Sequence, residues 1–197
     1  MDAIRNLIER SSSGHLDAPI PNREELETIY QAALRAPDHK GLKPSRFIEV
    51  SGECLDKLSN IFVNFAKKNL PEADKGIIEK YRKMPYRAPL IIILISGHTA
   101  DRGVPEIEQM MSTACSAQSI LLALNALEYS GMWRTGKLSF NQSISSLLGL
   151  RNNETVIGYI YVGTNIGPKK QKDLPNSSDF VETVSYTHLT LPTNREV

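Results

Sequence analysis

Several residues that could bind an anion gather between positions 33 and 47, where the chain reads ALRAPDHKGLKPSRF. This segment joins a helical pattern to a strand pattern and contains Arg35, His39 and Lys40. Loops between regular elements often carry binding groups, while the flanking elements hold those groups in place. The residue types therefore suit an anionic ligand, although a solvated basic loop is the simpler interpretation of this segment alone.

A second cluster has the donors that a phosphate requires. Arg10 is followed by three serines and a glycine. The segment thus offers a guanidinium, the hydroxyls of Ser11 and Ser12, and exposed backbone N–H groups. Serine-rich ends of helices are common, so this cluster indicates a phosphate site only together with other segments.

The third candidate segment, GMWRTG, contains the only tryptophan of the chain. Trp133 lies there beside Arg134 and Thr135, between two glycines that predict a turn. The indole could pack on a flat ligand or fill the core, and the sequence leaves both interpretations open.

Length and composition limit the class of protein. The 197 residues are 41% hydrophobic, which suffices for one compact domain. The net charge of +1 argues against a general nucleic-acid binder, because that class gains affinity from many phosphate contacts. Cys54 and Cys115 have no metal-ligand spacing, as expected in a reducing compartment. No signal-peptide core is visible, and the longest apolar run, 90–95, is too short to span a bilayer. We therefore expect a cytoplasmic protein that binds neither nucleic acid nor membrane.

The elements that must position these residues predict an α+β fold, with a mixed central sheet surrounded by helices. The second helix should bury a stripe made of Leu26, Ile29, Tyr30, Ala33 and Leu34. The predicted helices begin at Asp2, Asn22, Leu55, Glu72, Pro105 and Asn141 or Ser143, and the predicted strands cover 47–50, 90–95 and 156–163.

The longest predicted helix runs from Pro105 to Tyr129, and its middle, 110–127, is nearly free of charge. A helix that is apolar on all sides is expected to be buried on all sides. Small residues such as Ala114 and Ser116 would let another backbone approach closely. This helix therefore suits the centre of the fold or a subunit interface.

Taken together, the three segments resemble the nitroreductase family, in particular its small, minimal branch. The resemblance is carried by Arg10-Ser11-Ser12, by RAPDHK at 35–40 and by GMWRTG at 131–136, and it covers residues 1–182. Those residues are expected to form a single nitroreductase-like FMN-binding domain. The remaining residues, 183–197, are polar and lack a buried periodicity, so we expect a non-native or disordered tail.

The resemblance implies an FMN-dependent oxidoreductase with a nitroreductase-like fold, which works as an intertwined homodimer with two FMN sites at the interface. NAD(P)H would be the co-substrate. Carried over by position, the FMN contacts would come from Arg10, Ser11, Ser12, Arg35, His39, Trp133, Arg134 and Thr135.

The predicted function is therefore NAD(P)H oxidation coupled to reduction of a small-molecule electron acceptor such as a nitroaromatic or a quinone. A ping-pong mechanism would bring the hydride in from the nicotinamide and pass it on to the acceptor. Because FMN carries the hydride, we expect no catalytic side chain and no metal.

Three alternatives to this function have some support in the sequence. In related proteins the first cluster usually reads Arg-Arg-Ser, whereas this chain has Ser11, and His15 replaces a further basic residue. A non-catalytic flavin-binding or regulatory protein therefore remains open, as does a family member specialised for another reductive or flavin-consuming reaction. A metal-dependent hydrolase that uses Asp38, His39 and His98 is disfavoured, because no pair among them has ligand spacing.

Overall fold

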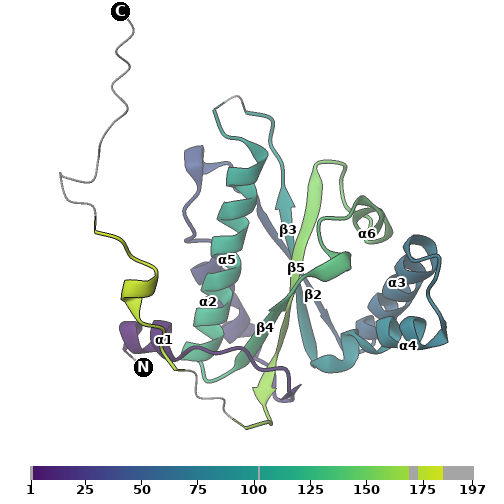
Figure 1. Ribbon diagram of the computed structural model, residues 1–197, viewed down its shortest axis with the longest axis horizontal. Helices are drawn as coiled ribbons and strands as arrows, with labels where there is room; N and C mark the ends of the chain where they lie inside the picture. Colours follow the sequence, from purple (N-terminus) through teal and green to yellow (C-terminus); the bar gives the residue numbers. More distant parts are fainter. Residues whose placement is uncertain (1, 102, 169–172, 184–197) are drawn as a thin grey trace, which may run out of the picture.

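The structure is a computed structural model that describes residues 2–101, 103–168 and 173–183. These residues form an antiparallel sheet with helices on both faces (Figure 1), which confirms the predicted α+β class. In chain order the elements are α1 (Ala3–Glu9), β1 (Leu16–Asp17), α2 (Arg23–Ala33), η1 (His39–Gly41), β2 (Ser45–Ser51), α3 (Cys54–Asn69), α4 (Lys75–Lys83), η2 (Pro85–Arg87), β3 (Leu90–Gly97), α5 (Glu106–Ala126), β4 (Ser130–Arg134), η3 (Gly136–Leu138), α6 (Gln142–Leu147), β5 (Glu154–Asn165) and η4 (Ser177–Asp179).

Strands β3 and β5 form the centre of the sheet. The strand order is β1-β5-β3-β2, and β4 pairs with β5 on the edge that β1 also uses. Each of these described pairs is antiparallel. Residues 90–95 are buried, which confirms the prediction of a strand covered on both faces.

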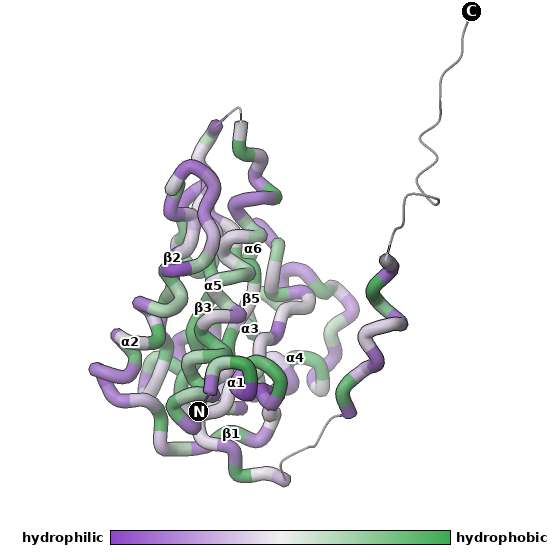
Figure 2. Tube along the Cα trace, turned by 90° about the vertical axis from the view of Figure 1, so that its left-hand side faces the viewer, coloured by the Kyte–Doolittle hydropathy of each residue, from purple (hydrophilic) through white to green (hydrophobic). Residues whose placement is uncertain are grey.

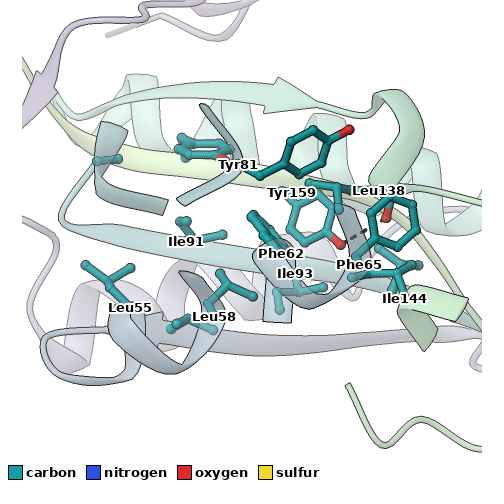
Figure 3. Packing of buried hydrophobic residues seen from close by; sticks show 14 of the residues in the cluster. Leu55, Leu58, Phe62, Phe65, Tyr81, Ile91, Ile93, Leu138, Ile144 and Tyr159 are labelled. Atoms are coloured by element: carbon teal, nitrogen blue, oxygen red, sulfur yellow. Dashed lines mark hydrogen bonds between the residues drawn. The ribbon is translucent and has the colours of Figure 1, made fainter. Parts of the chain in front are cut away.

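Two cores lie on opposite faces of the sheet, and β3 contributes alternate side chains to each. Figure 3 shows the core under α3, where the rings of Phe62 and Tyr159 meet edge to face with centroids 5.4 Å apart. The Tyr159 hydroxyl donates a hydrogen bond to the Leu138 carbonyl at 3.0 Å. This bond ties η3, which follows β4, to the core. The other core lies under α2 and α5.

The first two helices begin where the sequence predicts. Asp2 accepts hydrogen bonds from the first turn of α1, and Asn22 forms a capping box with Glu25. Leu26, Ile29 and Ala33 are buried as expected, and Tyr30 is half-buried. The prediction is wrong for Leu34, which is 64% exposed because it is the C-cap residue, where the chain leaves the helix.

Helix α1 buries none of its residues. Its large apolar side chains, Ile4, Leu7 and Ile8, are 63%, 52% and 50% exposed. Figure 2 shows α1 as a hydrophobic segment on the near face of the molecule. Asn6 ties the helix to α5, because its amide donates to the Leu122 carbonyl at 3.1 Å.

Helix α5 is buried on one side only, which corrects the expectation that it is buried on all sides. Its inner face packs on the sheet and on α2. On its outer face, Ile107 and Met111 are 55% and 58% exposed, and Cys115 is also exposed. Helix α1 lies against the C-terminal part of α5, where Asn6 bonds to Leu122 and Asn125. Beyond the first turn, which carries Glu106 and Glu108, the exposed residues of α5 are therefore uncharged.

The segment around Trp133 is a strand, whereas the glycines predicted a turn. Residues 130–134 pair with β5, and Trp133 lies opposite Ile160. The chain reverses earlier, at Glu128, whose φ of 65° belongs to the left-handed region. The turn therefore precedes the first glycine, and Gly131 is buried within the strand beside Leu121.

Among the described residues, no helix has both the length and the apolar character needed to cross a membrane. The predicted domain boundary at residue 182 remains a prediction. Residues 184–197 of the predicted tail lie outside the described residues.

Candidate functional site

The predicted site residues fall into two groups within one chain. The larger group, here called the β4 group, consists of Arg10, Ser11, Ser12, Trp133, Arg134 and Thr135. Its two segments meet at Gly14, where an added Cβ would lie 3.5 Å from Arg134 Nη2 and 3.8 Å from Met132 Cε.

The smaller group, here called the α5 group, consists of Arg35 and His39. His39 Nδ1 lies 2.9 Å from Glu108 Oε2, in the first turn of α5. Lys40 forms an ion pair with Asp101 at 2.8 Å, just before that helix. These contacts place His39, and the loop that joins it to Arg35, at the N-terminal end of α5.

The two groups lie near opposite ends of α5. The Arg10–Ser12 part of the β4 group follows α1, which is bonded to Leu122, whereas His39 of the α5 group contacts Glu108. The helix rises about 1.5 Å per residue, so these two anchor points are about 21 Å apart. Figure 1 likewise shows α1 beside the lower end of α5 and the chain after α2 beside its upper end. A single chain therefore does not bring all the predicted residues together.

Arg10 is held at the end of α1 with free donors. It is the C-cap residue of the helix and is half-buried. Its Nη1 donates a 3.4 Å hydrogen bond to Ser12 Oγ, and Ser13 Oγ in turn donates to Asn165 Oδ1 at 2.6 Å. Within the described ranges Arg10 forms no ion pair. The segment is thus anchored to β5 while its guanidinium remains available to an anion.

Arg134 lies against an aromatic ring. Its Cζ is 5.4 Å from the centroid of the Tyr161 ring, a distance within the cation–π range. Its Nε is buried and has no hydrogen-bond partner in the described structure. Burial lowers the pKa of Arg134 from its ordinary value, and the nearby Arg87 lowers it further. Buried donors are normally bonded, so this guanidinium lacks an acceptor that a ligand would supply.

Trp133 takes part in core packing. It is half-buried and packs against the core under α2 and α5. The indole of Trp133 packs directly against Gly158. A Cβ added at Gly158 would collide with Trp133 Nε1, so this packing requires a glycine at position 158. That Nε1 is itself buried without a partner. The structure thus supports the core interpretation of Trp133.

A cavity of about 390 Å³ opens beside the β4 group and is lined by Arg134 and Thr135. Lys80 and Arg87, which the sequence did not indicate as site residues, also line it. In the sequence, Lys80 and Arg87 lie in a charged helix and in the turn that follows it. Charged segments of this kind are typical of a solvated surface. One signal for an anion site was present in the sequence. Helix α4 contains more lysines and arginines than its single glutamate can pair with.

The residues of the hydrolase alternative have other roles. Asp38 accepts hydrogen bonds from the backbone N–H groups of Leu42 and Lys43, at 3.0 and 2.7 Å, and so shapes its own loop. His98 lines a different cavity together with Asp101. Over the described ranges, no group of three or more His, Cys, Asp or Glu side chains could hold a metal ion.

Comparisons with known proteins agree on one family. Residues 7–164 match the family model described as "Nitroreductase family". The chain is 33% identical over 182 residues to "Putative NAD(P)H nitroreductase YdjA" of Escherichia coli, an alignment that covers 92% of this chain and 98% of the relative.

Solved structures agree on the fold. A nitroreductase-like protein from Bacillus cereus aligns with a TM-score of 0.76 at 17% identity, over 93% of this chain and 96% of the other. A nitroreductase from Desulfovibrio desulfuricans, solved in complex with FMN, aligns with a TM-score of 0.72 at 17% identity, over 92% and 96% of the two chains. These similarities confirm the fold expected from the resemblance.

Proposed function

The chain belongs to the nitroreductase family, and we propose that it is an FMN-dependent NAD(P)H oxidoreductase. The names of its relatives support an NAD(P)H-linked reductase. The FMN complex of the Desulfovibrio neighbour supports the cofactor. The observation in this chain that carries the proposal is the buried Nε of Arg134, which has no acceptor in the described structure and belongs to a side chain that approaches Gly14, two residues after Ser12.

The residues of the β4 group fit FMN. The cofactor presents a phosphate, a polyol and a flat ring, and its phosphate needs guanidinium and hydroxyl donors. Arg10 and Ser12 supply such donors, and no carboxylate of the described chain forms an ion pair with Arg10 or Arg134. An anionic group could bind here without displacing an internal ion pair.

When bound, FMN would accept a hydride from NAD(P)H and pass it to an acceptor. The chain would supply binding, orientation and charge. Arg10 or Arg35 would place a fixed positive charge where negative charge develops on reduction, which favours the reduced state. No side chain needs to act as a nucleophile, in keeping with the expected absence of a catalytic side chain.

The active unit that we propose is a homodimer. The outer face of α5 carries exposed Ile107 and Met111, and α1 adds a further apolar surface. A second copy that packs along this face in the opposite direction would bring the partner's α5 group beside the β4 group. The separation of the two groups in one chain supports this arrangement, because each complete site would then need both copies.

The proposed reaction has ping-pong kinetics, with nitroaromatics or quinones as electron-poor acceptors. The test is to purify the protein, record its visible spectrum, and follow NADH and NADPH oxidation with and without a nitro acceptor. A yellow protein that consumes NAD(P)H only with an acceptor supports the proposal. A yellow protein without turnover would favour the non-catalytic flavin-binding alternative. A protein that takes up no FMN refutes the proposal.

A further inference from the structure

Three cations line the cavity beside the β4 group without any acidic side chain among its lining residues. They are Lys80 from α4, Arg87 from η2 and Arg134 at the end of β4. None of them forms an ion pair within the described part of the chain. A cleft lined by charges of one sign raises the local concentration of oppositely charged ligands.

The neighbouring cations of α4 are different in this respect. Arg82 and Lys83 both pair with Glu79, at 3.2 and 3.5 Å. Lys80 lies on the same helix, but its side chain reaches the cavity instead. Glu79 thus neutralises the two cations at the end of α4, whereas Lys80 at the cavity has no ion-pair partner among the described residues.

The two arginines of the cavity repel each other. Burial is the main cause of the lowered pKa of Arg134, and the charge of Arg87 adds to it. Tyr161 opposes this effect only in part, because burial holds its own pKa above the ordinary value and keeps the phenol neutral. An anion that enters between Arg87 and Arg134 would relieve this repulsion.

The rest of the cavity wall is apolar or aromatic. Met84, Leu138, Tyr159 and Tyr161 contribute to it. The Tyr159 hydroxyl already donates to the Leu138 carbonyl, so it is not free to donate to a ligand. Apolar walls with a few convergent polar groups are typical of small-molecule sites, and 390 Å³ lies within their usual size range. The lining suits a small aromatic molecule with a negatively charged group.

We propose that Lys80 and Arg87 form a subsite for the carboxylate of an aromatic electron acceptor, such as a nitrobenzoate, beside the Arg134 that the proposed function assigns to FMN. This inference rests on the proposed oxidoreductase function. The planar guanidinium of Arg87 offers the paired N–H donors that match a carboxylate. The acceptor would keep its carboxylate unchanged while its nitro group is reduced. Two electrons from one NAD(P)H and two protons, one of them from solvent, convert the nitro group to a nitroso group and water.

The test compares two acceptors of similar shape, 4-nitrobenzoate and the neutral 4-nitrobenzamide. The ratio of their kcat/KM values is measured for the FMN-loaded wild-type dimer and for the Arg87→Gln and Lys80→Gln variants. We expect the wild type to prefer the carboxylate about ten- to a hundredfold, as for one charge-assisted contact. Arg87→Gln should abolish most of that preference and leave the kcat/KM for the amide nearly unchanged. Lys83→Gln is the matched control, because Lys83 lies on the same helix but pairs with Glu79, and it should keep the preference.

A binding measurement separates this inference from the proposed function. Benzoate and benzamide are titrated calorimetrically into wild-type protein and into Arg87→Gln, with FMN affinity measured on both. Benzoate should bind more tightly than benzamide to the wild type only, and FMN affinity should stay unchanged in the variant. Equal binding of the two ligands by a yellow, active wild type would overturn the subsite and leave the proposed function intact.

Two further results would also overturn it. One is a loss of FMN affinity in Arg87→Gln, which would assign the cations to the cofactor. The other is a raised KM for NAD(P)H with an unchanged carboxylate preference, which would assign them to the phosphates of the nucleotide. A colourless protein that still prefers benzoate over benzamide would support the anion subsite while refuting the oxidoreductase function.

Discussion

Arg134 is held against Tyr161, with its Cζ 5.4 Å from the ring centroid. The guanidinium contacts the face of the ring through a cation–π interaction. This contact positions the positive charge and leaves the N–H donors in the plane of the guanidinium free to bind other groups. One of those donors, Nε, is buried without a partner in the described structure. Arg134 pairs with Tyr159 and Met132 pairs with Tyr161, so Arg134 and Tyr161 lie two positions apart along the β4–β5 ladder. Strands β4 and β5 thus hold the Arg134 guanidinium in position at the site.

Arg10→Ala is expected to weaken FMN binding about ten- to a hundredfold. The substitution removes a charge-assisted phosphate contact, whose loss costs about 1.5–3 kcal/mol. Fluorescence quenching in an FMN titration measures the effect. The control is Arg5→Ala on the same helix, because Arg5 pairs with Glu9 on the surface, and it should bind FMN like the wild type. Unchanged FMN affinity in Arg10→Ala would place the phosphate elsewhere.

Ser11→Arg is expected to tighten FMN binding. The resemblance to the nitroreductase family implies a second arginine at this position, and Ser11 is half-buried next to Arg10. A further guanidinium would add charge near the phosphate, provided that its side chain reaches it. The same titration detects the change, and His39→Ala provides a comparison that should weaken binding less than Arg10→Ala. Weaker binding by Ser11→Arg would show that the segment has no room for a second cation.

Much of this architecture could be predicted from the sequence, because the signals were local. Each local pattern predicts the structure of the residues that form it. Examples are the Asn22 cap, the aliphatic run of β3 and the uncharged middle of α5. The errors came from tertiary contacts. The pairing of residues 130–134 with β5 replaced a predicted turn, and the open outer face of α5 depends on what one chain can cover. Lys80 and Arg87 were missed because only the folded chain brings them to Arg134.

Met111→Glu is expected to weaken the homodimer. Met111 is 58% exposed on the outer face of α5, where a second copy would bury it in the proposed arrangement. A buried unpaired carboxylate is costly, so the dimer should dissociate at micromolar concentration in sedimentation velocity. Ile77→Glu on α4 is the control, since Ile77 is a partly exposed apolar residue away from α5. A dimer of unchanged strength in Met111→Glu would refute an interface on this face.

Glu154→Gln is expected to destabilise the fold at neutral pH by about 2–3 kcal/mol, below the cost of breaking a fully buried pair because Arg46 is half-exposed. Hydrogen bonds from Arg46, at 2.7 and 2.8 Å, lower the pKa of Glu154. A lowered pKa in the folded state stabilises the fold above the unfolded-state value of 4.5, and this stabilisation is lost as the pH falls through the folded-state value. The difference between wild type and variant should therefore shrink below about pH 4.5 in denaturant unfolding.

Glu9→Gln is the matched control for that measurement, because its pair with Arg5 is exposed. Its effect should stay within about 0.5 kcal/mol at any pH. A difference for Glu154→Gln that grows as the pH falls would contradict the assigned direction of the pKa shift.

The flavin content of the purified protein tests the central claim most directly. The protein is expressed, purified with added FMN, desalted and denatured in acid, and the released cofactor is identified by chromatography. We predict a yellow protein that releases FMN, and no FAD, in an amount equimolar with the chain. A colourless protein that retains no FMN after this treatment would contradict the proposed function.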